Sequence, residues 1–291
     1  MSFVMGASLL ALVTALACAL PGTFVVLRRS SMLVDAISHA ILPGIVLGYL
    51  ITRDLRSPVL IVGAAVAGLV VVVGSEWLTR SGLVTGDAPQ GLVFPALFSI
   101  GVLLVSTQFA DVHLDTHAVL VGDLNLAAFG QLTIGGVPVG PQYLFVMLGL
   151  LTLNAVVLAV LFPRLTLDSF DPGFARSLGP ASRLASAALM LLIAVTVTAG
   201  FHAAGAILVV ALVVVPPATA RLLTRRVPQM VIASLLVAAV GALGGFWLAY
   251  WLDAATSAGM AVAIGLVFVA VLAGRGLRRA AVTRRRLRLE H

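Results

Sequence analysis

Residues 31–51 read SMLVDAISHAILPGIVLGYLI, an apolar stretch that contains one aspartate, Asp35, and one histidine, His39. About 20 apolar residues cross a bilayer as a helix, so the length of this stretch predicts a membrane span. An aspartate at the centre of such a helix costs roughly 2.5–3.5 kcal/mol, which makes it by default a candidate functional residue. The spacing of four residues places Asp35 and His39 on one face of the helix.

The whole chain shares the apolar character of this stretch. It has 291 residues, of which 61% are hydrophobic and only 10% are charged. We expect apolar helices at about 3–27, 31–51, 58–79, 91–107, 142–163, 182–201, 204–223, 229–252 and 256–274. Alternating segments of ~10 residues, which are typical of membrane β-barrels, do not occur. The predicted fold class is an all-α membrane protein, a polytopic helical bundle of about nine spans.

The distribution of charge predicts the orientation of these spans. All 18 basic residues are arginines, and the cytoplasmic side of a membrane protein collects basic residues. If nine spans are counted back from a cytoplasmic C-terminus, only Arg53 and Arg56 fall on the outer side. An eight-span alternative that drops one early span destroys this sorting. We therefore expect the N-terminus outside and the C-terminus inside.

The remaining sequence shows no soluble domain, so we expect one transmembrane domain over residues 1–288. Residues 289–291, Leu-Glu-His, resemble the remnant of an expression tag and are excluded. Residues 108–141 are expected to form a non-helical outer region, and 164–181 a largely non-helical inner one. The arginine-rich tail that begins at Arg275 suits the anionic surface of a lipid bilayer.

Prolines are expected to interrupt two of the spans. Pro43-Gly44 follows His39 by one helical turn, and Pro216-Pro217 lies near the end of a later span. Proline removes a helical hydrogen bond, and a helix broken inside a membrane must line a cavity or pack on protein. From Arg29, His39 lies about 15 Å along the helix, which is near the middle of a hydrocarbon core ~30 Å thick.

The pairing of a carboxylate with an imidazole indicates a divalent transition metal. Two ligands do not complete such a site, because transition metals bind four to six ligands. A symmetry-related copy facing Asp35 and His39 would supply two more. The alternative is a buried hydrogen bond between Asp35 and His39 that only orders the helices.

Three further histidines are weaker candidates for metal ligands. His113 and His117 are four residues apart in the outer region, with Asp111 and Asp115 interleaved, and could equally lie in a solvated loop. His202 falls at the outer turn between two spans, where an ordinary turn residue is the simpler interpretation.

The inner segment at 170–179 has the pattern of a short surface helix. Asp171 before Pro172 is a helix-start signal, since Asp caps the helix and Pro occupies its first position. Apolar residues then recur at helical spacing (Phe174, Ala175 and Leu178), and Gly179 ends the segment. Such a helix suits insertion into the groove of a partner. The alternative is a plain connector between spans.

The composition also excludes several activities. A P-loop requires a lysine that reaches the phosphates, and this chain has none, so any ATP must be bound by another polypeptide. An intramembrane metalloenzyme would need H-E-x-x-H on a helix, which is missing. We expect no catalytic residues and no permanently bound cofactor.

Several segments together resemble the membrane permease subunit of bacterial ABC importers for zinc, manganese and related divalent metals. The most specific are LRRSSM at 27–32 and DAISHAILPG at 35–44. GLVF at 91–94 with LF at 97–98, the segment from Phe170-Asp171-Pro172 to Leu178-Gly179, and GAILVVAL at 205–212 leading to PPATA at 216–220 are also similar.

This resemblance implies a multi-pass protein of the bacterial inner membrane with the fold of a type II ABC importer. It implies a homodimer, two cytoplasmic ATP-binding subunits, an extracytoplasmic metal-binding protein and no nucleic-acid partner. Asp35 and His39 would gate or coordinate the passing metal, which is manganese or zinc, with iron left open. The segment at Phe170, Asp171, Pro172, Phe174, Ala175, Leu178 and Gly179 would be the coupling helix. The alternative is a secondary metal transporter driven by protons or sodium.

Overall fold

The computed structural model describes residues 3–53, 59–108, 124–134 and 137–287. Within these ranges, nine helices are long and apolar enough to span a membrane. They are α1 (Phe3–Leu27), α2 (Ser31–Thr52), α3 (Val59–Arg80), α4 (Ala88–Gln108), α7 (Gln142–Phe170), α9 (Pro180–Ala204), α10 (Ala206–Leu223), α11 (Val227–Trp251) and α12 (Thr256–Leu287). The prediction of a nine-span helical bundle is confirmed.

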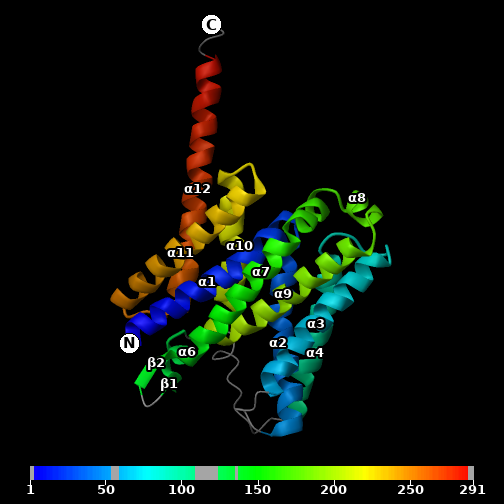
Figure 1. Cartoon of the computed structure of the whole chain (residues 1–291), viewed down its shortest axis with the longest axis vertical. Helices are drawn as coiled ribbons and strands as arrows, with labels where there is room; N and C mark the ends of the chain where they lie inside the picture. The colour runs from blue at the N-terminus through cyan, green and yellow to red at the C-terminus, as the bar shows by residue number, and fades with distance from the viewer. Residues whose placement is uncertain (1–2, 54–58, 109–123, 135–136, 288–291) are drawn as a thin grey trace.

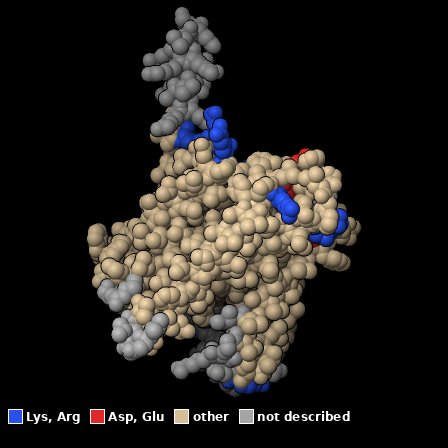
Figure 2. All heavy atoms as spheres, in the orientation of Figure 1, with Lys and Arg blue, Asp and Glu red and all other residues tan. Residues whose placement is uncertain are grey.

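Short elements lie at the two ends of the bundle (Figure 1). One end carries α8 (Pro172–Ser177), and we call it the α8 end. The other carries α6 (Leu124–Phe129) and an antiparallel hairpin of β1 (Gln131–Ile134) and β2 (Val137–Pro141), and we call it the hairpin end. Basic side chains lie near α8, where α12 leaves the bundle, and at the opposite tip of the molecule (Figure 2).

Helix α1 lies at the centre of the core and packs against α7, α9, α10 and α11. Its fully buried side chains include Leu10 and Phe24. Pro21 lies inside this helix and lacks an N–H, so the Ala17 carbonyl loses its usual helical donor. The side-chain nitrogen of buried Asn154 on α7 replaces that donor at 3.1 Å. A hydrogen bond between two spans therefore stabilises the central helix at its proline.

The expected break of α2 at Pro43-Gly44 was wrong, because α2 is helical from Ser31 to Thr52. The pair instead forms a packing notch. A Cβ at Gly44 would lie 2.3 Å from the carbonyl oxygen of Gly63 on α3, so the two backbones are in close contact there. On the other side, a Cβ at Gly101 of α4 would lie 2.9 Å from the Cβ of Pro43. Close packing against two neighbours holds the helix together through its proline.

Pro216-Pro217 was expected to kink or unwind its span, and it does not unwind it, since α10 is helical from Ala206 to Leu223. Pro217 cannot donate to the Val213 carbonyl. That oxygen faces α1 so closely that a Cβ at Gly22 would lie 2.1 Å from it. A weak Cα–H contact from a glycine is the kind of interaction that such a carbonyl accepts between helices.

Both regions predicted as non-helical contain regular structure. At the inner region, α7 extends to Phe170, α8 follows, and α9 begins at Pro180. Hydropathy marks where a helix leaves the apolar layer, and α7 continues past that point because polar contacts described below hold its last turns. At the outer region, the described residues form α6, β1 and β2.

Candidate metal site and coupling segment

Asp35 and His39 lie on one face of α2, as their spacing predicts. The distance from Asp35 Oδ1 to His39 Nε2 is 3.6 Å, and the side chains are 40% and 36% exposed. This distance is too long for a hydrogen bond. The alternative of a buried hydrogen bond that only orders helices therefore does not describe the pair, which leaves oxygen and nitrogen donors open to a ligand.

Two aromatic side chains of α4 hold the imidazole in place. The ring of His39 stacks on Phe94, with 5.4 Å between centroids and 25° between planes. Phe98 meets the same ring edge-on at 6.0 Å. The neighbouring Ser38 faces elsewhere: it is buried, and its hydroxyl donates to the Val34 carbonyl at 3.0 Å.

The described part of one chain does not complete a metal site. It contains no group of three or more His, Cys, Asp or Glu side chains that could hold an ion. Pro43 lies inside α2 and has no N–H, so the carbonyl oxygen of His39 lacks its usual helical donor. That oxygen is a further candidate ligand atom. The remaining ligands of a four- to six-coordinate ion must come from elsewhere.

Of the three weaker histidine candidates, the structure describes only His202. His113 and His117, with Asp111 and Asp115, lie outside the described residues. His202 lies in the last turn of α9, with its ring 5.1 Å from that of Tyr143. The Tyr143 hydroxyl in turn donates to the Ala199 carbonyl at 3.0 Å. His202 thus belongs to a contact between α7 and α9.

The predicted surface helix is present as α8. The backbone N–H of Phe174 donates to Asp171 Oδ1 at 2.9 Å, so Asp171 caps the helix as expected. Gly179 has a φ of 99°, which suits glycine, and α9 begins directly after it at Pro180. Ala175 is buried, in contrast to its expected place among the apolar residues that face a partner. The exposed apolar side chains of the segment are Phe170, Phe174 and Leu178.

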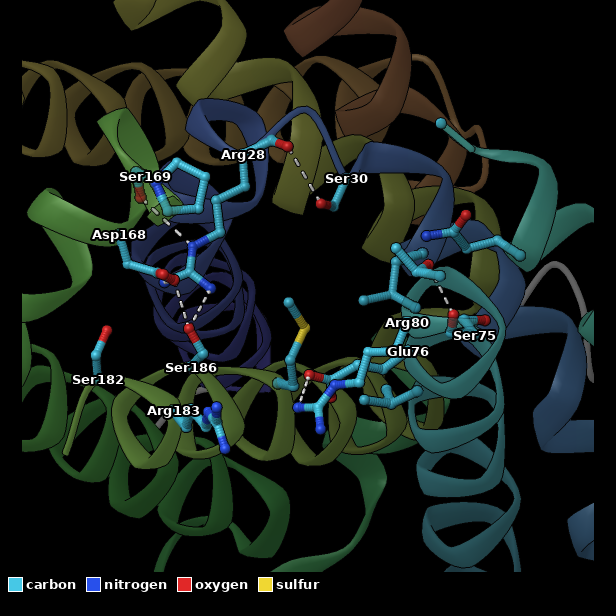
Figure 3. A pocket seen from close by; sticks show the side chains of 17 residues that line it. Arg28, Ser30, Ser75, Glu76, Arg80, Asp168, Ser169, Ser182, Arg183 and Ser186 are labelled. Carbon is cyan, nitrogen blue, oxygen red and sulfur yellow. Dashed lines mark hydrogen bonds and ion pairs between the residues drawn. The ribbon is translucent and has the colours of Figure 1, made fainter. Parts of the chain in front are cut away.

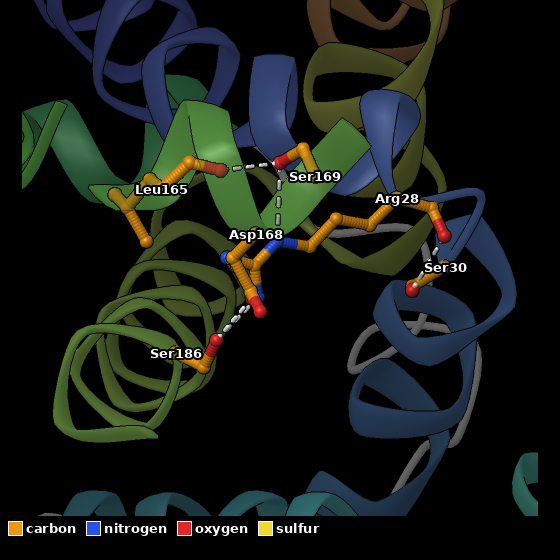
Figure 4. A network of polar contacts seen from close by, with 6 residues as sticks. All are labelled: Arg28, Ser30, Leu165, Asp168, Ser169 and Ser186. Atoms are coloured by element: carbon orange, nitrogen blue, oxygen red, sulfur yellow. Dashed lines mark hydrogen bonds and ion pairs between the residues drawn. The ribbon is translucent and has the colours of Figure 1, made fainter. Parts of the chain in front are cut away.

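A buried polar network beside α8 was missed in the sequence (Figure 4). Arg28, in the turn between α1 and α2, forms an ion pair with Asp168 on α7, with 2.9 Å between Nη2 and Oδ2. Arg28 also donates to Ser186 on α9 at 3.0 Å and to Ser169 on α7 at 3.4 Å. Ser186 donates to the same carboxylate at 2.5 Å. Burial lowers the pKa of the Arg28 guanidinium, and the charges of Asp168 and Glu76 oppose that shift.

A cavity of about 620 Å³ opens beside this network (Figure 3). One wall carries Arg28 and Asp168, and the facing wall is formed by α3. On α3, Glu76 accepts a hydrogen bond from Arg80 at 2.6 Å. The cavity therefore separates α3 from α7 and α9 at the α8 end. Most of the residues that line it are polar, including Ser30, Ser75, Ser169, Ser182 and Ser186.

Comparison with known proteins places this architecture in context. The sequence profile of the ABC 3 transport family matches residues 1–275. The zinc transport system membrane protein TroD of Treponema pallidum is 40% identical over 263 residues, which are 90% of this chain and 71% of TroD. The manganese transport system membrane protein MntD of Bacillus subtilis is 38% identical over 251 residues, which are 86% of this chain and 85% of MntD.

A solved structure shares the fold. The chain aligns with one in PsaBC from Streptococcus pneumoniae with a TM-score of 0.73 and 22% sequence identity. The alignment covers 93% of this chain and 91% of that one. The arrangement of helices described above is therefore a fold that a solved structure already shows.

Proposed function

Because the chain belongs to the ABC 3 transport family and is the membrane permease of an ABC transport system, we propose that it imports a divalent transition-metal ion. The zinc and manganese systems of the two relatives support this class of cargo. Both ions accept carboxylate and imidazole ligands, as does ferrous iron. ATP hydrolysis is the task of a separate subunit, since the chain has no lysine with which to build a P-loop.

The observation that carries the proposal is the position of Asp35 and His39 inside a membrane span. Both side chains are more than one-third exposed on the single chain. A carboxylate exposed to hydrocarbon is costly, so such groups face protein or a water-filled path. Their donor atoms lie close enough to bind one ion together, and the ring of His39 stacks on Phe94. We assign them to transient binding of the ion, which must be weak enough to allow release.

A second copy of the chain would complete the site. A homodimer with α2 facing its symmetry mate supplies two carboxylates and two imidazoles, and it also covers the exposed polar face of α2. This arrangement meets the four-ligand minimum of a transition metal. The coordination number and the cost of leaving Asp35 against lipid both support such a dimer.

The α8 end is assigned to the cytoplasm and the hairpin end to the outside. The positive-inside rule supports this orientation, since described arginines outside the helical spans at the α8 end include Arg28, Arg225 and Arg226. It leaves the N-terminus outside and the C-terminus inside. A metal-loaded binding protein then docks at the hairpin end.

Helix α8 is the contact to the ATP-binding subunits. The exposed side chains of Phe170, Phe174 and Leu178 form an apolar surface outside the spans, which suits a groove on a soluble partner. Two such subunits beneath a homodimer move α8 as they bind ATP, and the helices rock between outward and inward openings. The ion passes Asp35 and His39 during this change.

The test is uptake of manganese or zinc into proteoliposomes that contain the permease and its ATP-binding subunit. Asp35→Asn removes the negative charge and one carboxylate oxygen with little change of shape, and His39→Asn removes the imidazole with its Nε2. We expect ATP-dependent uptake to fall at least about tenfold, a free-energy difference of about 1.4 kcal/mol. Ser38→Ala is the matched control on the buried face of α2 and should transport normally.

Near-normal uptake by both site variants would refute the assigned residues. Uptake by the permease alone, without ATP or the ATP-binding subunit, would instead identify a secondary transporter driven by an ion gradient.

A further inference from the structure

The turn that begins α2 is tied to the last turn of α7 by the Arg28–Asp168 ion pair. Arg28 lies three residues before Ser31, the first residue of α2, and Asp168 lies three residues before Asp171, which caps α8. The pair therefore joins the start of the helix that carries Asp35 and His39 to the start of the coupling helix. Figure 4 shows the guanidinium reaching from the α1–α2 turn to Asp168 and Ser186.

This connection is stiff because it is largely buried and is made by several polar contacts. The side chains of Arg28 and Asp168 are only 11% and 16% exposed. Removing one partner of a buried pair leaves an uncompensated charge, so the two groups cannot separate without a penalty. The hydroxyls of Ser169 and Ser186 hold the guanidinium from two helices, and Ser169 itself donates to the Leu165 carbonyl at 2.6 Å.

The pair lies on one wall of the neighbouring cavity. At this level of the bundle, about 620 Å³ of space separates α3 from the ends of α7 and α9 (Figure 3). Direct packing joins α2 and α3 to α9 elsewhere in the bundle, and the ion pair adds a polar connection at this level. The guanidinium of Arg28 spans from the α1–α2 turn to the wall formed by α7 and α9.

We propose that Arg28 and Asp168 are positioning residues that transmit the movement of α8 to the base of α2, and so couple ATP hydrolysis to release or entry of the metal ion. This inference rests on the proposed function. Coupling between distant sites requires a physical element that both sites bias, and here that element is one ion pair between the α1–α2 turn and α7. Neither residue contacts the ion; both act through the position of α2.

The test uses Asp168→Asn in the complete complex of permease and ATP-binding subunit. Asparagine keeps the size of the side chain and an acceptor for Ser186, but it removes the charge that Arg28 contacts. Three quantities are measured: the ATP-binding subunit that co-purifies, the rate of ATP hydrolysis, and metal uptake. We expect co-purification and hydrolysis to persist, while metal transported per ATP falls by roughly 5- to 150-fold, the range typical of coupling between sites.

Glu76→Gln is the matched control. It removes a carboxylate from the opposite wall of the same cavity and breaks the exposed Glu76–Arg80 pair, but it leaves the link to α7 intact. Its ratio of metal to ATP should equal that of the wild type. An unchanged ratio in Asp168→Asn, or an equal fall in Glu76→Gln, would overturn the proposal.

A second variant covers the case in which Asp168→Asn does not assemble. Arg28→Lys keeps the charge but loses the fork that contacts Ser169 and Ser186 together. It should lower the same ratio, and the double variant should be no worse than either single one, as residues that act as a unit are non-additive. Additive losses would contradict the link. Failure of the wild-type complex to transport metal would refute the proposed function, an outcome distinct from any of these.

Discussion

The side-chain nitrogen of Asn154 lies 3.1 Å from the carbonyl oxygen of Ala17, a backbone group that Pro21 leaves without its helical donor. The same nitrogen donates to the Thr196 hydroxyl at 3.0 Å. One amide thus connects α7 to both α1 and α9 in the middle of the bundle. Asn154, Thr196 and Ala17 are all inaccessible to solvent, so their polar groups depend on one another for hydrogen bonds.

Asn154→Ala should therefore destabilise the protein by about 1–3 kcal/mol, the cost of leaving buried polar groups unpaired. Thermal unfolding in detergent measures the effect. The control is Pro21→Ala, which restores an N–H to serve the Ala17 carbonyl. In that background the loss caused by Asn154→Ala should be smaller, and an equal loss in both backgrounds would show that the Ala17 contact does not matter.

A second prediction concerns the ring behind the metal ligand. Phe94→Leu removes the aromatic partner of His39 but keeps an apolar side chain. An aromatic pair contributes about 0.5–1.5 kcal/mol, so we expect metal uptake at limiting concentration to fall by roughly 2- to 10-fold. Phe94→Tyr keeps the ring and should retain most of the uptake. If the leucine variant transported like the wild type, stacking would have no part in holding the imidazole.

A third prediction tests α8 as the docking element. Phe174→Ala removes an exposed aromatic side chain from the surface assigned to the ATP-binding subunit. Side chains at the centre of an interface contribute ~2 kcal/mol or more, so the affinity for that subunit should fall by about 30-fold and less of it should co-purify. Leu153→Ala, which alters an exposed apolar residue in the middle of α7, should leave it unchanged. Equal recovery in both variants would place the docking surface elsewhere.

The nine spans could be predicted because their signal is local. A run of about 20 apolar residues leaves few alternatives to a helix in a bilayer. The separation of four residues between Asp35 and His39 then places both on one face of that helix. The cap at Asp171 was predictable for the same reason, since its hydrogen bond to Phe174 joins residues three apart.

The Arg28–Asp168 pair could not be predicted in this way. Counting spans puts both residues at the same end, but it does not select Arg28 from the other arginines there. The partner is chosen by how the α1–α2 turn packs against α7 and α9, and that contact joins residues 140 positions apart in the sequence. Asp168 itself was a signal for an ion pair, because it is an acidic residue next to the expected docking helix, on the side of the membrane where most arginines are expected.

The effect of Pro43 was mispredicted because it depends on residues far from it. In isolation, proline inside a helix removes a hydrogen bond and favours a break. Here Gly63 on α3 and Gly101 on α4 provide room for Pro43 and Gly44, and the resulting close packing keeps α2 helical on both sides. A single sequence does not reveal which distant glycines meet a given proline.

The last prediction follows from this packing. A methyl group at Gly44 would lie 2.3 Å from the carbonyl oxygen of Gly63 and 2.7 Å from the Cα of Ala64, both of them backbone atoms that cannot rotate away. Gly44→Ala must therefore push α2 and α3 apart, and overpacking of this kind costs about 1–3 kcal/mol. The matched control is Gly91→Ala on α4, because a Cβ there meets nothing within 4 Å. Replacing glycine by alanine in an open helical position stabilises a helix by up to about 1 kcal/mol. Thermal unfolding of the two purified variants should hence shift in opposite directions, with Gly44→Ala less stable than the wild type and Gly91→Ala at least as stable. If Gly44→Ala unfolded at the wild-type temperature, α2 and α3 would have room to spare, and close packing could not explain why α2 stays helical through Pro43.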